Sequence, residues 1–313
     1  MKIIIVGPGA MGCLFAGLLV EAGQKDVWLL DKHEKRAREI TKNGLKIEGI
    51  GGSRSVSGIR CTANPQETGI ADLILIFVKS YDTAEASHSI LPVIGINTTI
   101  LTLQNGLTNI NTISDILGAD RVIAGITAHG ATMLGTGHIR HAGVGETTIG
   151  ELESGQSDRT KRIADVLSSA GFQTVISDNI HNSIWAKLII NAAINPLTAI
   201  TKLKNGALLE YNEVRKLLGM TAEEAARIAL ARQIALPYDS TTSAVEAVCK
   251  ATSANVSSML QDVLRHKRTE IDAINGAIVN EAKKAGIEAP INETLTYLVK
   301  GIERGAKDIE LGI

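Results

Sequence analysis

Aromatic residues and net charge are both scarce in this chain. Phe, Trp and Tyr make up only 3% of its 313 residues, and 32 Lys and Arg against 33 Asp and Glu leave a net charge of −1. Nucleic-acid binding depends on basic surfaces and on aromatic side chains that stack on bases. The composition therefore argues against a nucleic-acid partner, and the near-zero charge argues against binding to an anionic membrane.

Cysteine is rare, and no later apolar run is long. The spacing of Cys13, Cys61 and Cys249 fits neither a metal-type pair nor a disulfide framework, which is typical of a reducing compartment. The most apolar run beyond the N-terminal region, residues 71–78, is too short to span a bilayer. The chain begins directly with a predicted strand and shows no basic leader. We expect a cytoplasmic protein that has no membrane partner.

A strand, a glycine-rich turn and a helix follow one another at the start of the chain. The apolar residues 3–6 lead into GPGAMG at residues 7–12, and a helical pattern over residues 14–19 stops at Gly23. This order is the context that a dinucleotide-binding G-x-G-x-x-G motif requires. A glycine-rich turn without a ligand is the alternative interpretation.

Each glycine of that motif has a physical role. Gly7 permits the tight turn, Gly9 lets the backbone approach a pyrophosphate, and Gly12 lets the helix pack on the strand. The free N–H groups of the helix N-terminus then face the anion. The residues that we expect to contact the cofactor here are Gly7, Pro8, Gly9, Ala10, Met11 and Gly12.

Apolar periodicity divides the chain into an α/β part and a helical part, and 44% hydrophobic content allows a sizeable core. Strands are predicted at residues 2–6, 27–30, 73–78, 99–103 and 122–126, with helices such as 35–43 and 109–117 between them. Helices are predicted at residues 182–203, 208–232, 242–250, 259–285 and 293–304. We predict a doubly wound Rossmann domain over residues 1–178, in which residues 127–177 add antiparallel or mixed strands, and an all-helical domain over residues 179–313.

A polar stripe crosses the first helix of the second domain. Lys187, Asn191 and Asn195 lie four residues apart and so share one face among Leu, Ile and Ala. Burying these groups is costly unless they bind something. Pro196 should kink the helix and leave the carbonyl of Ala192 without its helical partner. The pattern indicates a cleft; a lysine that extends to solvent and two solvated or capping asparagines are the alternative.

A second polar segment follows further along the chain. Ser258 with Gln261 three residues later is a capping-box pattern, and a helix start is also a site for a carboxylate. On a continuous helix Glu270 would lie about 18 Å away, so the two residues could bracket the two ends of a cleft. The alternatives are a simple helix cap and a solvated glutamate.

Three further candidates follow predicted strands of the first domain. Lys79, Asn105 and the His129–Ala131 turn stand where a doubly wound sheet places its ligands. Taken alone, Lys79 is a surface lysine, Asn105 with Gly106 is a turn signal, and nothing marks His129 as catalytic.

Taken together, these segments resemble the ketopantoate reductase family, over nearly the whole chain. The last two of the matching segments are the most specific and the glycine motif is the least. The segments are GPGAMG (7–12), VKSYDT (78–83), LQNGLTN (103–109), AHGA (128–131), WAKLIINAAINPLTAI (185–200) and NVSSMLQDVLRHKRTEIDAINGAIV (255–279).

The resemblance implies that reduced nicotinamide delivers hydride to the C2 ketone of 2-dehydropantoate to give (R)-pantoate, a step of pantothenate and coenzyme A biosynthesis. It implies that Lys187 is the general acid, which suits an ammonium beside a developing alkoxide. The family pattern assigns substrate contacts to Asn191, Asn195, Asn255 and Ser258, a place between cofactor and substrate to Asn105, and cofactor contacts to Lys79, Ala131 and Glu270.

One position departs from the family pattern. Members that prefer NADPH often carry arginine at or beside the end of the second strand, where this chain has Asp31, Lys32 and, further on, Arg36. An acid there accepts hydrogen bonds from ribose hydroxyls and repels a 2′-phosphate. We therefore expect NAD(H) to be favoured through Asp31. NADP(H) is the alternative, because Lys32 could take the phosphate.

Three other questions stay open. The same Lys and Asn stripe would serve an enzyme that reduces another branched 2-keto acid. A non-catalytic dinucleotide-sensing protein could keep the fold. The apolar faces of helices 208–232 and 259–285 could meet either another domain or another subunit, and the second arrangement would give a homodimer.

Overall fold

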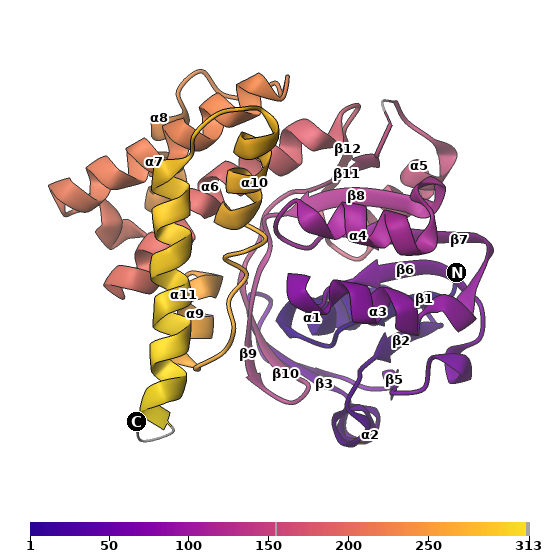
Figure 1. Cartoon of the computed structure of the whole chain (residues 1–313). Coiled ribbons are helices and arrows are strands. Elements are labelled where there is room, and N and C mark those ends of the chain that lie inside the picture. Colours follow the sequence, from indigo (N-terminus) through magenta and orange to yellow (C-terminus); the bar gives the residue numbers. More distant parts are fainter. Residues whose placement is uncertain (154, 311–313) are drawn as a thin grey trace. The chain divides into compact units, whose positions relative to one another are not determined.

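The computed structural model describes residues 1–153 and 155–310, with side chains through residue 305. The chain forms two compact units: residues 1–104 with 109–180, and residues 105–108 with the chain from His181 onward (Figure 1). The short segment 105–108 groups with the second unit although the sequence predicts it within the first domain. Residues 311–313 of the predicted helical domain lie outside the described residues.

The first unit is built on an eight-stranded sheet of order β12-β11-β8-β7-β6-β1-β2-β5. Its strands are β1 (Ile3–Val6), β2 (Val27–Leu30), β5 (Arg60–Thr62), β6 (Ala71–Ile76), β7 (Ile94–Thr102), β8 (Val122–Thr127), β11 (Thr147–Glu151) and β12 (Thr174–Ile176). The six strands from β5 to β8 are parallel, and β11 joins β8 antiparallel. The order β5-β2-β1-β6-β7-β8 is that of a dinucleotide-binding sheet and confirms the predicted Rossmann fold.

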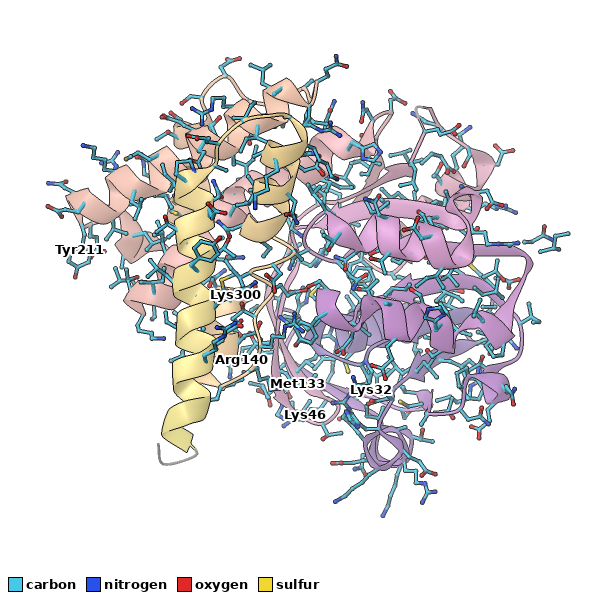
Figure 2. All side chains as sticks on the ribbon, viewed as in Figure 1. Lys32, Lys46, Met133, Arg140, Tyr211 and Lys300 are labelled. Carbon is cyan, nitrogen blue, oxygen red and sulfur yellow. The ribbon has the colours of Figure 1, made fainter. Side chains whose placement is uncertain are left out.

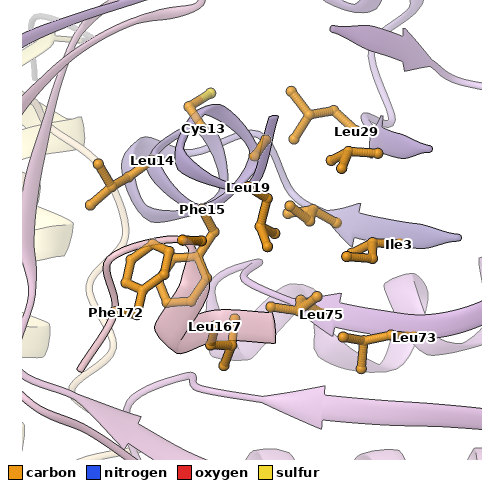
Figure 3. Packing of buried hydrophobic residues seen from close by; sticks show 14 of the residues in the cluster. Ile3, Cys13, Leu14, Phe15, Leu19, Leu29, Leu73, Leu75, Leu167 and Phe172 are labelled. Carbon is orange, nitrogen blue, oxygen red and sulfur yellow. The ribbon is translucent and has the colours of Figure 1, made fainter. Parts of the chain in front are cut away.

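Continuous apolar strands explain why both faces of this sheet are covered. Ile3 and Ile5 pack on one side with helices α1, α2 and α5, whereas Ile4 and Val6 pack on the other side with α3 and α4. These helices are α1 (Ala10–Glu21), α2 (Glu34–Asn43), α3 (Thr83–Ser89), α4 (Thr108–Leu117) and α5 (Asp158–Ser169). Figure 3 shows the first of these cores, in which the rings of Phe15 and Phe172 stack with centroids 3.8 Å apart.

A second, four-stranded sheet of order β4-β3-β10-β9 packs on α1. Its strands are β3 (Leu45–Gly49), β4 (Arg54–Val56), β9 (Gly130–Gly135) and β10 (His138–Gly143), which carry the labelled residues Lys46, Met133 and Arg140 (Figure 2). The prediction that residues 127–177 extend the main sheet is therefore correct for β11 and β12 and wrong for β9 and β10. The reason is that β10 pairs with β3, more than 80 residues earlier in the chain.

Short 3-10 helices complete the first unit at η1 (Pro65–Thr68), η2 (Ser80–Asp82), η3 (Leu91–Val93) and η4 (Ala119–Arg121). The second unit is helical: α6 (Ile180–Thr201), η5 (Gly206–Leu209), α7 (Asn212–Ala231), α8 (Thr241–Ala251), α9 (Ser258–Leu264), α10 (Asn275–Lys284) and α11 (Pro290–Glu310). By length and composition α6 could cross a membrane, but most of that stretch is buried, as in the central helix of a folded domain.

The predicted helix over residues 259–285 is wrong, because the structure breaks it into α9 and α10. His266 adopts a left-handed backbone at φ 52°. The N–H of Lys267 then donates to the carbonyl of Asp262, and that of His266 donates to Val263. These bonds are a Schellman ending, which usually shows itself in sequence through glycine or asparagine. A histidine at position 266 does not indicate a helix end in the sequence.

Helix α6 continues through Pro196 with an unusual repair of its hydrogen bonding. The amide Nδ2 of Asn275 donates to the carbonyl of Ala192 at 2.9 Å, the group that Pro196 was predicted to leave without a helical partner. Asn275 is fully buried, and its Nδ2 also donates to Asn292 at 3.0 Å. This bond ties α10 to the middle of α6.

Candidate functional site

The glycine turn after β1 has the shape that a pyrophosphate needs. Gly7 has φ +93°, and a side chain on Gly12 would come within 2.2 Å of the carbonyl of Gly7. Gly9, by contrast, has nothing within 4 Å of the position of a Cβ. It is the N-cap of α1 and supplies no side-chain cap. The turn therefore combines close strand–helix packing with open space beside a helix N-terminus.

The turn lies at the point where the sheet changes its direction of winding. Strands β1 and β6 are neighbours, but the helices that follow them pack on opposite faces. Such a switch point is where doubly wound sheets bind their ligands. A side chain on Gly7 would come within 2.9 Å of the backbone nitrogen of Val78, so the two strand ends meet closely here. Lys79 follows at once as the N-cap of η2.

Asp31 at the end of β2 has a fully buried carboxylate that is bound from within the unit. Arg36 donates from Nη2 to Oδ1 at 2.6 Å and from Nε to Oδ2, and the backbone N–H of His33 donates at 3.0 Å. In the sequence Arg36 stands out only as a cation five residues after Asp31. Its fork holds the orientation of Asp31; Oδ1 already accepts two hydrogen bonds, whereas Oδ2 accepts one and keeps capacity for another.

Lys32 is bound by two carboxylates of another segment. Its ammonium donates to Asp82 at 3.1 Å and to Glu85 at 3.3 Å. These hydrogen bonds raise the pKa of Lys32, the one from Asp82 most, so the group stays charged. The cation that could have taken a 2′-phosphate is thus already paired.

Gln104, which the sequence did not mark, joins neighbouring strand ends. Its Nε2 donates to the carbonyl of Val78 at 2.7 Å and to the hydroxyl of Thr83 at 2.9 Å. It thereby fixes the end of β7 to the segment that carries Lys79.

Ala131 lies in β9 opposite His141 of β10. His141 and His129 are both buried, and their ring nitrogens Nε2 and Nδ1 are 3.2 Å apart. Burial lowers the pKa of each imidazole. This neutral pair supports the strand that carries Ala131.

The helical unit presents its candidates from α6 and from the segment between α9 and α10. Asn195 is buried, whereas Lys187 and Asn191 are partly exposed. Burial lowers the pKa of Lys187 to about 8, and the charge of Glu270 opposes this effect. Glu270 is itself buried, which excludes the interpretation as a solvated glutamate. The helical spacing of 18 Å from Ser258 does not apply, because α9 ends at Leu264.

The cap of α9 lies one residue earlier than predicted. Ser257, not Ser258, accepts the hydrogen bond of Leu260 N–H at 3.1 Å, and the Gln261 side chain donates to the carbonyl of Val256 instead of closing a capping box. The prediction was wrong because two adjacent serines both fit the pattern and the backbone selects between them. Ser258 is left exposed at the first position of the helix.

Two contacts hold the residues just before α9 in the helical unit. The hydroxyls of Ser257 and Thr198 are 2.6 Å apart and join α9 to α6. The carbonyl of Asn255 accepts the N–H of Asn205 at 3.1 Å. The sequence gave no role to Asn205, whose partner lies 50 residues away.

Asn105 belongs to the segment that groups with the helical unit. The next residue, Gly106, packs so tightly on Ala273 that a Cβ would come within 2.4 Å of its carbonyl oxygen. Ala273 is three residues after Glu270, so Asn105 and Glu270 stand on adjoining segments.

Known proteins resemble the chain over almost its whole length. Two family models match, described as ketopantoate reductase PanE/ApbA at residues 3–154 and as its C-terminal part at residues 179–303. A 2-dehydropantoate 2-reductase of Pyrococcus abyssi is 39% identical over 97% of this chain and 98% of its own. One of Halobacterium salinarum is 33% identical over 97% and 99%.

Solved structures agree with these matches. A PanE/ApbA family ketopantoate reductase of Ralstonia eutropha has a TM-score of 0.89 at 34% identity, covering 98% of this chain and all of its own. A D-mandelate dehydrogenase in complex with NADH and anilino(oxo)acetate has a TM-score of 0.91 at 29% identity, with the same coverage. The chain therefore belongs to the ketopantoate reductase family.

Proposed function

We propose that this protein is a 2-dehydropantoate 2-reductase, which reduces the C2 ketone of 2-dehydropantoate to (R)-pantoate. The observation that carries the proposal is the position of Lys187 on α6, one turn before Asn191 and two before Asn195, where burial lowers its pKa to about 8 against the opposing charge of Glu270. A lysine so placed on the helix of Asn191 and Asn195 has few structural reasons to be there. Full-length relatives named for this reaction support the choice of substrate.

Lys187 has the properties of a general acid. Reduced nicotinamide, when bound, would supply a hydride to the ketone carbon and leave negative charge on the carbonyl oxygen. The ammonium of Lys187 stabilises that charge and transfers a proton from Nζ to the oxygen, which completes the hydroxyl. With a pKa of about 8 the group is largely protonated at neutral pH, yet it releases its proton more readily than an exposed lysine.

The other polar residues have binding roles in this proposal. Asn191 and Asn195 hold the hydroxyl and carboxylate groups of the substrate, and Asn255 and Ser258 hold its carboxylate end. Asn105 lies between cofactor and substrate. The proposed cofactor contacts are the GPGAMG turn together with Lys79, Ala131 and Glu270. The turn fits this role, because its open space at Gly9 adjoins the start of α1.

We assign NADH as the favoured cofactor. The buried carboxylate of Asp31, oriented by Arg36, can accept ribose hydroxyls and would repel a 2′-phosphate. Equal or better catalytic efficiency with NADPH would overturn this assignment.

A second candidate is a reductase of another branched 2-keto acid. The likeness to the D-mandelate dehydrogenase supports it, because that structure holds NADH on the same fold with a different 2-oxo compound. Pocket size, rather than the Lys and Asn stripe, would decide between such substrates.

The test follows the loss of reduced-cofactor absorbance with 2-dehydropantoate and a panel of branched and aromatic 2-keto acids. We expect the highest kcat/KM with 2-dehydropantoate and its collapse in Lys187→Ala. A higher kcat/KM with another keto acid would favour the second candidate. Cofactor binding without turnover on any of them would instead leave a dinucleotide-sensing protein.

We further propose a cytoplasmic homodimer. The location rests on three free, buried cysteines. The assembly rests on the exposed Tyr297 and Leu298 of α11, apolar side chains that a partner subunit would cover. Light scattering coupled to size exclusion measures the mass directly.

A further inference from the structure

The ion cluster around Lys32 unites two segments that come from different strands. Lys32 follows β2, whereas Asp82 and Glu85 come from the start of α3, after β6. Both carboxylates reach the same ammonium, at 3.1 and 3.3 Å. Figure 2 labels Lys32 on the first unit, to which all three residues belong.

Neither carboxylate is needed elsewhere in the described structure. Asp82 is the N-cap residue of α3, but its side chain makes no capping hydrogen bond. Glu85 is 68% exposed and pairs with Lys32. Exposed ion pairs contribute about 0–1 kcal/mol to stability. The cluster therefore calls for an explanation other than the stability of the fold.

The position of the cluster, directly after Asp31, supplies such an explanation. The residue that ends β2, Asp31, is where doubly wound folds recognise the cofactor's ribose, and a 2′-phosphate would stand there. Asp31, Asp82 and Glu85 carry three negative charges, and Lys32 and Arg36 carry two positive ones, so the neighbourhood has a net charge of 2 − 3 = −1. Both cations are already paired with carboxylates. A phosphate carrying nearly two negative charges would therefore have to displace a carboxylate in order to pair with Lys32 or Arg36.

We propose that Asp82 and Glu85 determine cofactor specificity, because they hold Lys32 and so deny it to the 2′-phosphate of NADPH. This inference rests on the proposed function. It differs from the role of Asp31, since it assigns the rejection of NADPH to Asp82 at the end of η2 and Glu85 of α3, which do not belong to the ribose-binding strand end. NADH lacks the phosphate and is unaffected by the cluster.

The test compares cofactor binding in the wild type and in the double variant Asp82→Asn/Glu85→Gln, without keto acid, by fluorescence titration of the reduced nicotinamide. The substitutions keep side-chain size and remove both charges. We expect the Kd for NADPH to fall roughly tenfold, and that for NADH to change less than about twofold. The gain should shrink at high salt, because the groups are exposed.

Two matched variants identify the cause. Asp158→Asn/Asp165→Asn removes two exposed carboxylates from α5 and should leave both Kd values unchanged. Adding Lys32→Met to the Asp82→Asn/Glu85→Gln variant should abolish its gain for NADPH. An unchanged NADPH Kd in the double variant would overturn the proposal, and so would a gain that persists without Lys32. Thermal unfolding of each variant checks that the fold is intact.

The outcome also separates this inference from the proposed function. If the wild type binds NADPH more tightly than NADH, the cofactor assignment fails, whatever the variants do. If the wild type prefers NADH and the double variant shows no gain, the assignment stands and only the role of Asp82 and Glu85 fails.

Discussion

The two units of this protein hold their polar groups in different ways. In the first unit the ion pairs of Lys32 with Asp82 and Glu85 are open to solvent, although the carboxylate of the neighbouring Asp31 is buried. In the helical unit Glu270 is buried, and Lys187 has a pKa lowered by burial. Solvent screens the charges of the exposed Lys32 cluster more strongly than those of Glu270 and Lys187. Substitutions should therefore tune affinity in the first unit and change the chemistry in the second.

The largest effect is expected at Lys187. Lys187→Ala removes the proposed proton donor, and we expect kcat to fall by about 10²- to 10⁴-fold. The Kd for NADH should stay nearly constant, because binding of the dinucleotide is assigned mainly to the first unit. Steady-state kinetics and a fluorescence titration measure the two quantities. A variant that keeps more than a tenth of wild-type kcat would remove Lys187 from the mechanism.

The pH dependence of kcat sharpens the same point. The acid must be protonated to act, so activity should be present below the pKa of Lys187, about 8, and decline as pH rises through it. The charge of Glu270 raises that pKa, so Glu270→Gln should move the decline to lower pH. Since Glu270 is also a proposed cofactor contact, the profiles are compared at saturating NADH. A decline at the same pH in both proteins would contradict the coupling.

The glycine turn allows folding and binding to be separated within the first unit. In Gly12→Ala the added Cβ would collide with the backbone of Gly7, and we expect a loss of about 1–3 kcal/mol of stability together with weaker NADH binding. Gly9→Ala is the matched control, because it meets open space. It should fold normally and lose only affinity. Equal melting temperatures for both variants would show that Gly12 is not packed as described.

These glycines also explain what could be predicted from the sequence. A tight turn requires glycine at particular positions, so the GPGAMG motif predicted both the turn and the class of ligand that such a turn binds. The four-residue spacing of Lys187, Asn191 and Asn195 likewise predicted one helix face. The fold class and the family assignment followed from such local signals.

Features that no residue type signals by itself could not be predicted. His266 takes a backbone conformation usually left to glycine, and so the break after α9 was missed. Arg36 was visible as a cation, but its fork on Asp31 depends on the turn between them. Asn275 resembled any helical asparagine, since its partner, the carbonyl of Ala192, lies 83 residues away.

The contribution of the Asn275 hydrogen bonds to stability can be tested directly, and we expect a moderate effect. Asn275→Ala would remove the hydrogen bonds to the Ala192 carbonyl and to Asn292. Asn292 is fully buried, so water cannot replace the lost donor there. We expect a loss of about 1–3 kcal/mol, measured by urea unfolding. If α6 also shifts, the KM for the keto acid should rise, as Asn191 and Asn195 flank the supported carbonyl. A variant as stable as wild type would mean that the bond has no structural role.

The smallest expected effect concerns the His129–His141 pair in the first unit. Burial lowers both pKa values below the ordinary 6.5, so the unfolded chain binds more protons than the folded one once the pH drops below that value. Stability should be complete above about pH 6.5 and decline as the pH falls through the lowered pKa values of the pair. Thermal unfolding across this window measures the slope. His129→Asn/His141→Asn should flatten it, because the amides do not titrate, and an unchanged slope would assign the effect to other groups. Burial is the largest cause of the lowered pKa of both histidines, as it is for Lys187 in the helical unit.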